Sequence, residues 1–261
     1  MTAFARLHHG DAPLLLPNAW DHASAAALAA RGFAAIGTTS LGVAAAAGLP
    51  DGAAATREPT VLLARQLGGG PFLLTVDAED GFSRSPDDVA ALASRLADAG
   101  AVGINLEDGL GSARLHAAKI AAVKEAVPDL FVNARTDTYW LGDGDPTETH
   151  RRLDAYRGAG ADGVFVPGLS DPARIAGLVR TLDVPLNILY SSEGPTLARL
   201  GDLGVRRVSL GSLLYRRALG AALETAEAVR AGRPPQGPTP AYPEVQALSR
   251  TGVRSRDRRA E

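Results

Sequence analysis

Cysteine is absent from this sequence of 261 residues. Its absence excludes disulfide bonds, thiolate metal sites and any cysteine that acts as a nucleophile or an acid. Lysine is almost absent: Lys119 and Lys124 are the only two, and both fall in one helical pattern at 112–126. A Schiff-base aldolase needs a lysine at the end of a strand, so this enzyme class is excluded as well.

Several other signatures are missing. No apolar run approaches the ~18 residues that a membrane-spanning helix needs, and the N-terminal stretch has no secretory leader pattern. The net charge of −2 gives no global attraction to nucleic acid or to a membrane surface. Glycine-rich phosphate turns (GxGxxG, GxxxxGK[ST]) and the GxSxG elbow of serine hydrolases do not occur. We therefore expect a cytoplasmic protein that binds neither nucleic acid nor membranes.

Apolar residues make up 46% of the chain, which is enough for one large core. Short strand-like runs alternate with longer helical patterns, and each run ends in polar or glycine-containing residues. The helical pattern at 86–99 has Ser85 as its expected N-cap and Gly100 just after its end. The strand-like runs lie at 14–16, 34–36, 72–76, 102–106, 130–133, 163–166, 185–189 and 207–210.

Eight β-then-α units predict a (β/α)8 TIM barrel, because an open doubly wound sheet rarely needs so many regular units. We expect this barrel, with a short N-terminal segment, to occupy 1–231 and to end in a long helix at 213–231. A second region, 232–261, reads as a proline-rich linker, a short helix at 242–248 and a solvated tail at 254–261. In a barrel the residues just after the strands converge on one mouth, so the polar strand ends are candidate site residues.

Carboxylates gather after two neighbouring strands. Asp77, Glu79 and Asp80 follow the third run, and Glu107 and Asp108 follow the fourth. Strands lie ~4.8 Å apart, so these tips can aim carboxylates at one point, and oxygen ligands without His or Cys favour Mg²⁺ or Mn²⁺. A solvated acidic rim, or acids that stabilise the following helices, is the alternative interpretation. Asp77 and Glu79 alternate along the strand and can face the barrel together, whereas Asp80 points to the other side.

Two further strand ends suit a carboxylate ligand. Arg135 follows the fifth run, and its guanidinium can bind a substrate carboxylate through two parallel hydrogen bonds or form an ion pair with the nearby acids. Thr39 and Ser40 follow the second run in a glycine-containing turn, where hydroxyl and backbone N–H groups can cradle an anion. These residues together predict a binding site for a small-molecule carboxylate.

Six ordered motifs resemble the isocitrate lyase/phosphoenolpyruvate mutase superfamily over nearly the whole barrel. They read LLLPNAWDHASA, AIGTTSLGVAAAAGLPDG, VDAEDGFS, GINLEDG, VNARTD and GADGVFVPG. The resemblance implies a Mg²⁺-dependent enzyme that acts on 2-oxo or 2-hydroxy carboxylates through an enolate-like intermediate. It also implies a homodimer or homotetramer in which the C-terminal helix is exchanged between subunits.

The resemblance also implies roles for individual residues, carried over position by position. Metal binding is implied for Asp77, Glu79 and Glu107, with Glu79 in place of the second aspartate of a D-x-D pair. Asp51 matches an aspartate near the metal and the substrate, and it is our first candidate for proton transfer, ahead of His116 and Tyr139. Substrate binding is implied for Thr39, Ser40, Leu41, Arg135 and Asn187.

The sequence departs from the family where the reaction is decided. Lyases of this superfamily carry a cysteine-containing loop after strand four, but here 109–120 reads GLGSARLHAAKI. A glutamate expected after strand six is replaced by Gly168. We expect a lyase-like enzyme on a small 2-oxo or 2-hydroxy (di)carboxylate, with C–C bond cleavage as the leading reaction. Phosphoenolpyruvate mutase-like or phosphonopyruvate hydrolase-like P–C chemistry, and a catalytically silent 2-oxoacid-binding protein, are the alternatives.

Overall fold

A parallel β-barrel forms the centre of the computed structural model, which describes residues 1–249. Nine strands are hydrogen-bonded in the order β1-β9-β8-β7-β6-β5-β4-β3-β2. The predicted tail at 254–261 lies outside the described residues. The strands are β1 (Leu14–Leu16), β2 (Asn18–Ala19), β3 (Ala35–Thr38), β4 (Leu73–Asp77), β5 (Ala101–Glu107), β6 (Phe131–Arg135), β7 (Gly163–Phe165), β8 (Leu186–Leu189) and β9 (Arg207–Ser209).

The first predicted strand is divided in two, and this division closes the barrel. β1 pairs with β9, whereas β2 pairs with β3. Pro17 separates them, and it has no N–H to donate to a neighbouring strand. Its carbonyl accepts a hydrogen bond from Gly37 N at 2.9 Å, while the carbonyl of Leu16 accepts one from Leu210 N at 3.1 Å. One segment therefore joins both ends of the sheet, and the (β/α)8 fold is confirmed.

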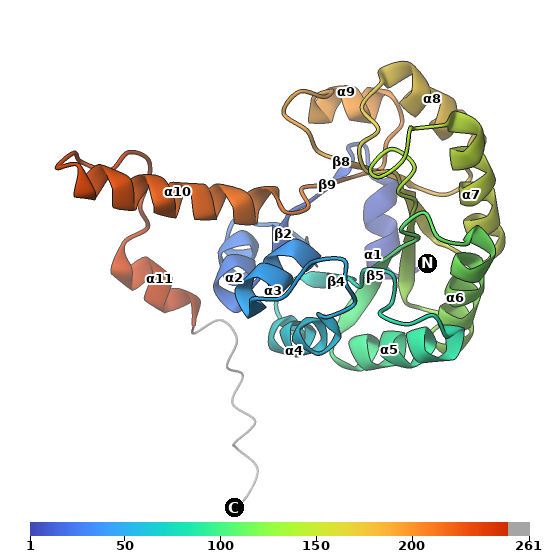
Figure 1. The fold of residues 1–261 in the computed structure, drawn as a ribbon, viewed down its shortest axis with the longest axis horizontal. Coiled ribbons are helices and arrows are strands. Elements are labelled where there is room, and N and C mark those ends of the chain that lie inside the picture. Colours follow the sequence, from blue (N-terminus) through green and yellow to red (C-terminus); the bar gives the residue numbers. More distant parts are fainter. Residues whose placement is uncertain (250–261) are drawn as a thin grey trace, which may run out of the picture.

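Helices surround the strands, as Figure 1 shows. Three of them begin with a proline in the first turn after a residue whose side chain accepts from a backbone N–H: Ser85, Asp145 or Asp171. The predicted N-cap Ser85 is thus confirmed. The helices are α2 (His22–Ala30), α3 (Ser40–Ala47), α4 (Arg57–Leu67), α5 (Pro86–Asp98), α6 (Ala113–Ala126), α7 (Pro146–Gly158), α8 (Pro172–Thr181) and α9 (Leu197–Asp202).

Both ends of the described chain add helices outside this repeat. At the N-terminus, α1 (Ala3–Arg6) and a 3₁₀ turn (Leu7–His9) place Phe4 against Phe131 of β6. At the other end, α10 (Leu213–Arg230) projects from the barrel, and α11 (Tyr242–Leu248) returns to contact α2 (Figure 1). Among residues 1–249, none of the helices combines the length and apolar character that crossing a bilayer requires.

Candidate active site

A cavity lies at the carboxyl ends of the strands, where a barrel of this kind presents its chemistry. Six predicted site residues line it together: Thr39, Ser40, Leu41, Asp51, Asp77 and Arg135. Sequence reasoning missed other lining residues, because nothing in their local pattern separates an inward-facing strand residue from a core residue. The missed residues are Asn105, Trp140, Phe165, Leu189 and Ser209, whereas Asn18, Pro167, Gly211 and Ser212 belong to the strand ends that were predicted as a group.

Asp77, at the end of β4, is held by the neighbouring strand end. Its Oδ2 accepts a hydrogen bond from Ser40 N at 3.2 Å, and its own N–H donates to Thr38 Oγ1 at 2.9 Å. Burial raises the pKa of the Asp77 carboxyl, and the charge of Asp51 adds to this rise while Arg135 opposes it. The Ser40 N–H of the predicted anion cradle is thus already used within the protein.

Arg135, at the end of β6, is fixed between two acids. Its Nη1 lies 2.6 Å from Glu107 Oε2, and its Nε lies 2.6 Å from Asp137 Oδ1. Within residues 1–249 no hydrogen bond or ion pair uses its Nη2, so this group remains available to a ligand in the cavity. Burial raises the pKa of Glu107 to about 8. The positive charge of Arg135 opposes this rise, and the negative charges of Asp77 and Asp137 add to it. This carboxyl would ionise more readily if a further cation shared the site.

Glu79 is buried and turned toward a different loop. Its backbone adopts a left-handed φ of 47°, and its carboxylate accepts a hydrogen bond from the hydroxyl of Thr56. Burial raises the pKa of Glu79, and the charges of Asp51 and Asp77 raise it further. Asp80 points away, as predicted, and its Oδ2 lies 3.4 Å from Lys119 Nζ of α6.

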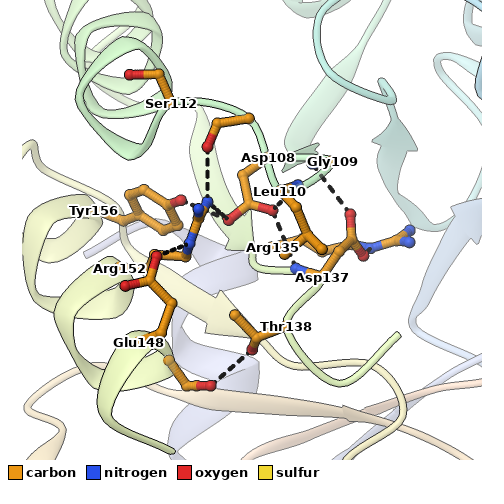
Figure 2. A network of polar contacts seen from close by, with 12 residues as sticks. Asp108, Gly109, Leu110, Ser112, Arg135, Asp137, Thr138, Glu148, Arg152 and Tyr156 are labelled. Carbon is orange, nitrogen blue, oxygen red and sulfur yellow. Dashed lines mark hydrogen bonds and ion pairs between the residues drawn. The ribbon is translucent and has the colours of Figure 1, made fainter. Parts of the chain in front are cut away.

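Asp108, in the turn after β5, is hydrogen-bonded to helix α7 and to the segment after β6, as Figure 2 shows. Its Oδ2 accepts from Arg152 Nη1 at 2.9 Å and from the Tyr156 hydroxyl at 2.6 Å, both on α7. Its Oδ1 accepts from the backbone N–H groups of Leu110 and Asp137, at 3.0 and 3.1 Å. Burial alone would raise the pKa of Asp108, but these hydrogen bonds outweigh burial and lower it. Asp137 in turn holds Arg135, so the network supports the cavity wall.

Five predicted residues do not line the cavity: Glu79 and Glu107, described above, and Asn187, His116 and Tyr139. Asn187 is 1% exposed and exchanges hydrogen bonds with Ser209, which itself lines the cavity. His116, the second candidate for proton transfer, is buried against Tyr156, with ring centroids 4.5 Å apart. Burial lowers the pKa of His116 to about 4, so this ring is neutral at physiological pH. Tyr139 bonds through its hydroxyl to Arg174 on the outside of the site.

The side chains around Asp77 fit a hard divalent cation in their chemistry. They offer only carboxylate oxygens, and a cation would offset both the burial that chiefly raises their pKa values and the repulsion between their charges. In residues 1–249, however, no three acidic or imidazole groups converge in an arrangement ready to hold a metal. Mg²⁺ commonly keeps waters and takes one or two direct carboxylates. Direct binding by Asp77, with Asp51, Glu79 and Glu107 acting through water, agrees with both observations.

Comparisons with known proteins add a family relationship to this geometry. A model of the phosphoenolpyruvate phosphomutase family matches residues 4–230. The Mycobacterium tuberculosis protein Rv1998c is 47% identical over 250 residues, which cover 94% of this chain and 95% of that protein. The Corynebacterium glutamicum protein named probable 2-methylisocitrate lyase 2 is 31% identical over 225 residues, covering 78% of this chain and 72% of its own.

A solved structure is also similar to this chain over the whole barrel. It is a candidate lyase or mutase from Burkholderia cenocepacia J2315, with a TM-score of 0.84 and 35% sequence identity. The match covers 95% of this chain and 93% of that chain. The similarity therefore spans the strand ends that form the cavity as well as the helices around them.

Proposed function

The chain belongs to the phosphoenolpyruvate mutase/isocitrate lyase superfamily, and from this premise we propose that it is a Mg²⁺-dependent carbon–carbon lyase. Its substrate is a small 2-oxo or 2-hydroxy (di)carboxylate, cleaved through an enolate-type intermediate. The observation that carries the proposal is the meeting of Asp51, Asp77 and Arg135 in one cavity. A lyase relative that covers most of the chain supports C–C cleavage over P–C chemistry.

Substrate binding falls to Arg135 and to the turn after β3. The free Nη2 of Arg135 donates to a substrate carboxylate, while Glu107 and Asp137 keep the guanidinium in place. The hydroxyls of Thr39 and Ser40 line the same cavity and donate to the oxygens of the ligand. Because Arg135 is anchored on two sides before any ligand binds, little ordering entropy is lost on binding.

Stabilisation of the enolate depends on the acidic strand ends. When bound, Mg²⁺ acts as a Lewis acid that stabilises negative charge on the oxygens of the substrate. Asp77 would hold it directly, and Asp51, Glu79 and Glu107 would hold its waters. Asp51 lies in an exposed loop at the cavity, so it can exchange protons with solvent and deliver one to the nascent carbanion.

The proposal is tested by incubating the protein with Mg²⁺ and a panel of oxaloacetate, 2-methylisocitrate, substituted malates and phosphonopyruvate. We expect the release of a 2-oxoacid from a carbon acid, measured by a coupled dehydrogenase assay. Phosphate release from phosphonopyruvate alone would instead establish P–C chemistry. Saturable binding of oxalate with no turnover of any compound would establish a binding protein.

The variant Asp77→Ala tests the metal site separately. It should weaken the Mg²⁺-dependent binding of oxalate by ~100-fold, since a direct ligand is lost. Asp80→Ala is the matched control, because Asp80 pairs with Lys119 outside the cavity. Unchanged binding by Asp77→Ala would refute the assignment of Asp77.

We also propose that the protein is a homodimer or homotetramer that exchanges α10. This helix projects from the barrel (Figure 1), and its residues Leu219 and Leu223 are 50% and 59% exposed. Exposed leucines one helical turn apart form an apolar stripe that a partner subunit can cover. Light scattering of the wild type and of Leu223→Glu checks the proposal, which fails if both are monomers.

A further inference from the structure

A buried arginine within the barrel contacts two of the residues that form the cavity. Arg207, on β9, is 0% exposed, yet within the described residues it forms no ion pair with a carboxylate. Its Nη2 donates to Asn105 Oδ1 at 3.1 Å, its Nε donates to Ser209 Oγ at 3.2 Å, and its guanidinium lies 6.0 Å from the centre of the Phe4 ring. Both hydrogen-bond partners line the cavity. A buried guanidinium is costly, so its retention under a ligand site calls for a role.

The contact with Arg207 determines which way the Asn105 amide points. A guanidinium has no acceptor atom, so the Asn105 atom facing it must be the oxygen. The same oxygen accepts a second hydrogen bond, from Asn133 Nδ2 at 2.9 Å. The usual ambiguity between amide oxygen and nitrogen is thereby removed. Asn105 Nδ2 must lie on the opposite side of the side chain.

The free amide nitrogen belongs to the cavity. Asn105 pairs in register with Asp77 on one side and Asn133 on the other, so it sits between two strand ends of the site. It is 6% exposed and lines the cavity, and in the described part of the chain its Nδ2 has no hydrogen-bond partner. This nitrogen is not among the buried polar atoms that lack a partner, so it faces the open space of the cavity, where a ligand oxygen can accept from it.

We propose that Asn105 is a substrate-contacting residue that donates a hydrogen bond to a negatively charged oxygen of the ligand, and that Arg207 is the positioning residue that fixes this donor. The inference rests on the proposed function and adds a specificity element to it. The ligand must offer an acceptor oxygen, such as a carboxylate or enolate oxygen, at this point of the cavity. A ligand with an N–H group there would meet another donor and be rejected.

The test compares Asn105→Ala with Asn133→Ala. Both remove a partner of the same buried network, but only Asn105 supplies the free donor. With Mg²⁺ present, calorimetry should show oxalate binding weakened roughly 10- to 100-fold in Asn105→Ala, the loss expected for a hydrogen bond to a charged group. Asn133→Ala should change the affinity less than ~3-fold, since Arg207 still orients the amide. Thermal unfolding of both variants shows whether each remains folded.

The role of Arg207 is tested by a measurement that a general loss of order in the cavity would not change. Oxamate carries an amide in place of one carboxylate of oxalate, so the ratio of the two affinities reports the donor at Asn105. In Arg207→Gln the Asn105 amide can turn over and accept from oxamate, and we expect the preference for oxalate to fall ~10-fold. Arg207→Lys keeps a pure donor facing Asn105 Oδ1 and should retain the preference.

The outcomes separate the two proposals. Equal oxalate affinity in the wild type and Asn105→Ala would overturn the inference and leave the proposed function standing. An unchanged oxalate-to-oxamate ratio in Arg207→Gln would remove the positioning role of Arg207. A wild type that bound no member of the panel would overturn the proposed function and the anion contact of Asn105 together.

Discussion

Three neighbouring carboxylates at and just after the end of β4 contact three different parts of the molecule. Asp77 faces the cavity, Glu79 bonds to Thr56, and Asp80 pairs with Lys119 on α6. The sequence predicted that Asp80 would point away from Asp77, because side chains alternate along a strand. The same alternation predicted that Glu79 would face the barrel with Asp77, which is wrong: β4 ends at Asp77, the backbone of Glu79 is left-handed, and Glu79 does not line the cavity.

Proton transfer is predicted to depend on Asp51. Among the described residues, Asp51 and Asp77 are the two carboxylates that line the cavity. The other candidates, His116 and Tyr139, do not line it. In Asp51→Asn we expect turnover of the best substrate of the panel to fall ~100-fold or more, because general acid–base catalysis contributes about that factor.

Oxalate affinity should fall less than turnover in Asp51→Asn, since the isosteric amide can still bond to a metal-bound water and no proton is transferred on binding. Asp98→Asn, at the exposed end of α5, is the control and should match the wild type in both assays. Steady-state kinetics and calorimetry measure the two effects. Wild-type turnover by Asp51→Asn would assign the proton transfer to another group.

At the scale of elements, the turn between β5 and α6 is held from both sides. Gly109 N donates to Asp137 Oδ2 at 3.2 Å (Figure 2), and Arg152 Nη1 donates to the carbonyl of Gly111 at 3.0 Å. The sequence indicated a short turn here in place of the cysteine-containing loop. It could not identify Arg152 as a partner of Asp108, because the two lie 44 residues apart and no local pattern links them.

The Asp108 network is predicted to stabilise the fold through this connection. In Asp108→Asn the amide cannot accept every hydrogen bond of the carboxylate, and a buried Arg152 loses one of its two ion-pair partners. Removing one partner of a buried pair costs ~3–5 kcal/mol, and the isosteric amide and the remaining Glu148 bring the expected loss to the lower end. Urea unfolding measures the free-energy change.

The same Asp98→Asn control should shift the free energy of unfolding by less than ~0.5 kcal/mol, as expected for an exposed substitution. A loss of similar size in both variants would mean that the Asp108 network contributes little to stability. Oxalate affinity of Asp108→Asn provides a second measurement, because the amide has a single acceptor oxygen for the N–H of Asp137 and the guanidinium of Arg152, and Asp137 holds Arg135.

At the scale of the whole molecule, the eight repeating units and their polar ends were predictable from sequence, but the ends of the barrel were not. The break at Pro17 depends on which strand each half pairs with, and this is a tertiary choice. The N-terminal helix α1 has only 4 residues, too few for a periodic pattern. Its role becomes visible only in the packed state, where Phe4 and His8 lie against Phe131.

His8 gives this N-terminal packing a pH dependence. It is 1% exposed, its ring stacks on Phe131 at 4.5 Å, and its Nδ1–H donates to the carbonyl of Phe4 at 3.1 Å. Burial and, second, the charge of Arg207 lower the pKa of His8 to about 3, from 6.5 in the unfolded chain. Between these values the unfolded chain binds a proton that the folded protein does not, so stability falls as the pH is lowered.

The predicted size of this effect is ~2 kcal/mol on going from pH 7 to pH 5, since each pH unit below 6.5 contributes ~1.4 kcal/mol. His8→Phe keeps an aromatic ring against Phe131 but cannot bind a proton. Its free energy of unfolding should therefore fall by ~2 kcal/mol less than that of the wild type over the same pH interval. Urea titrations at both pH values measure the difference. Equal losses in the two proteins would mean that His8 accepts a proton without leaving the core, and that the charge of Arg207 beside it is tolerated.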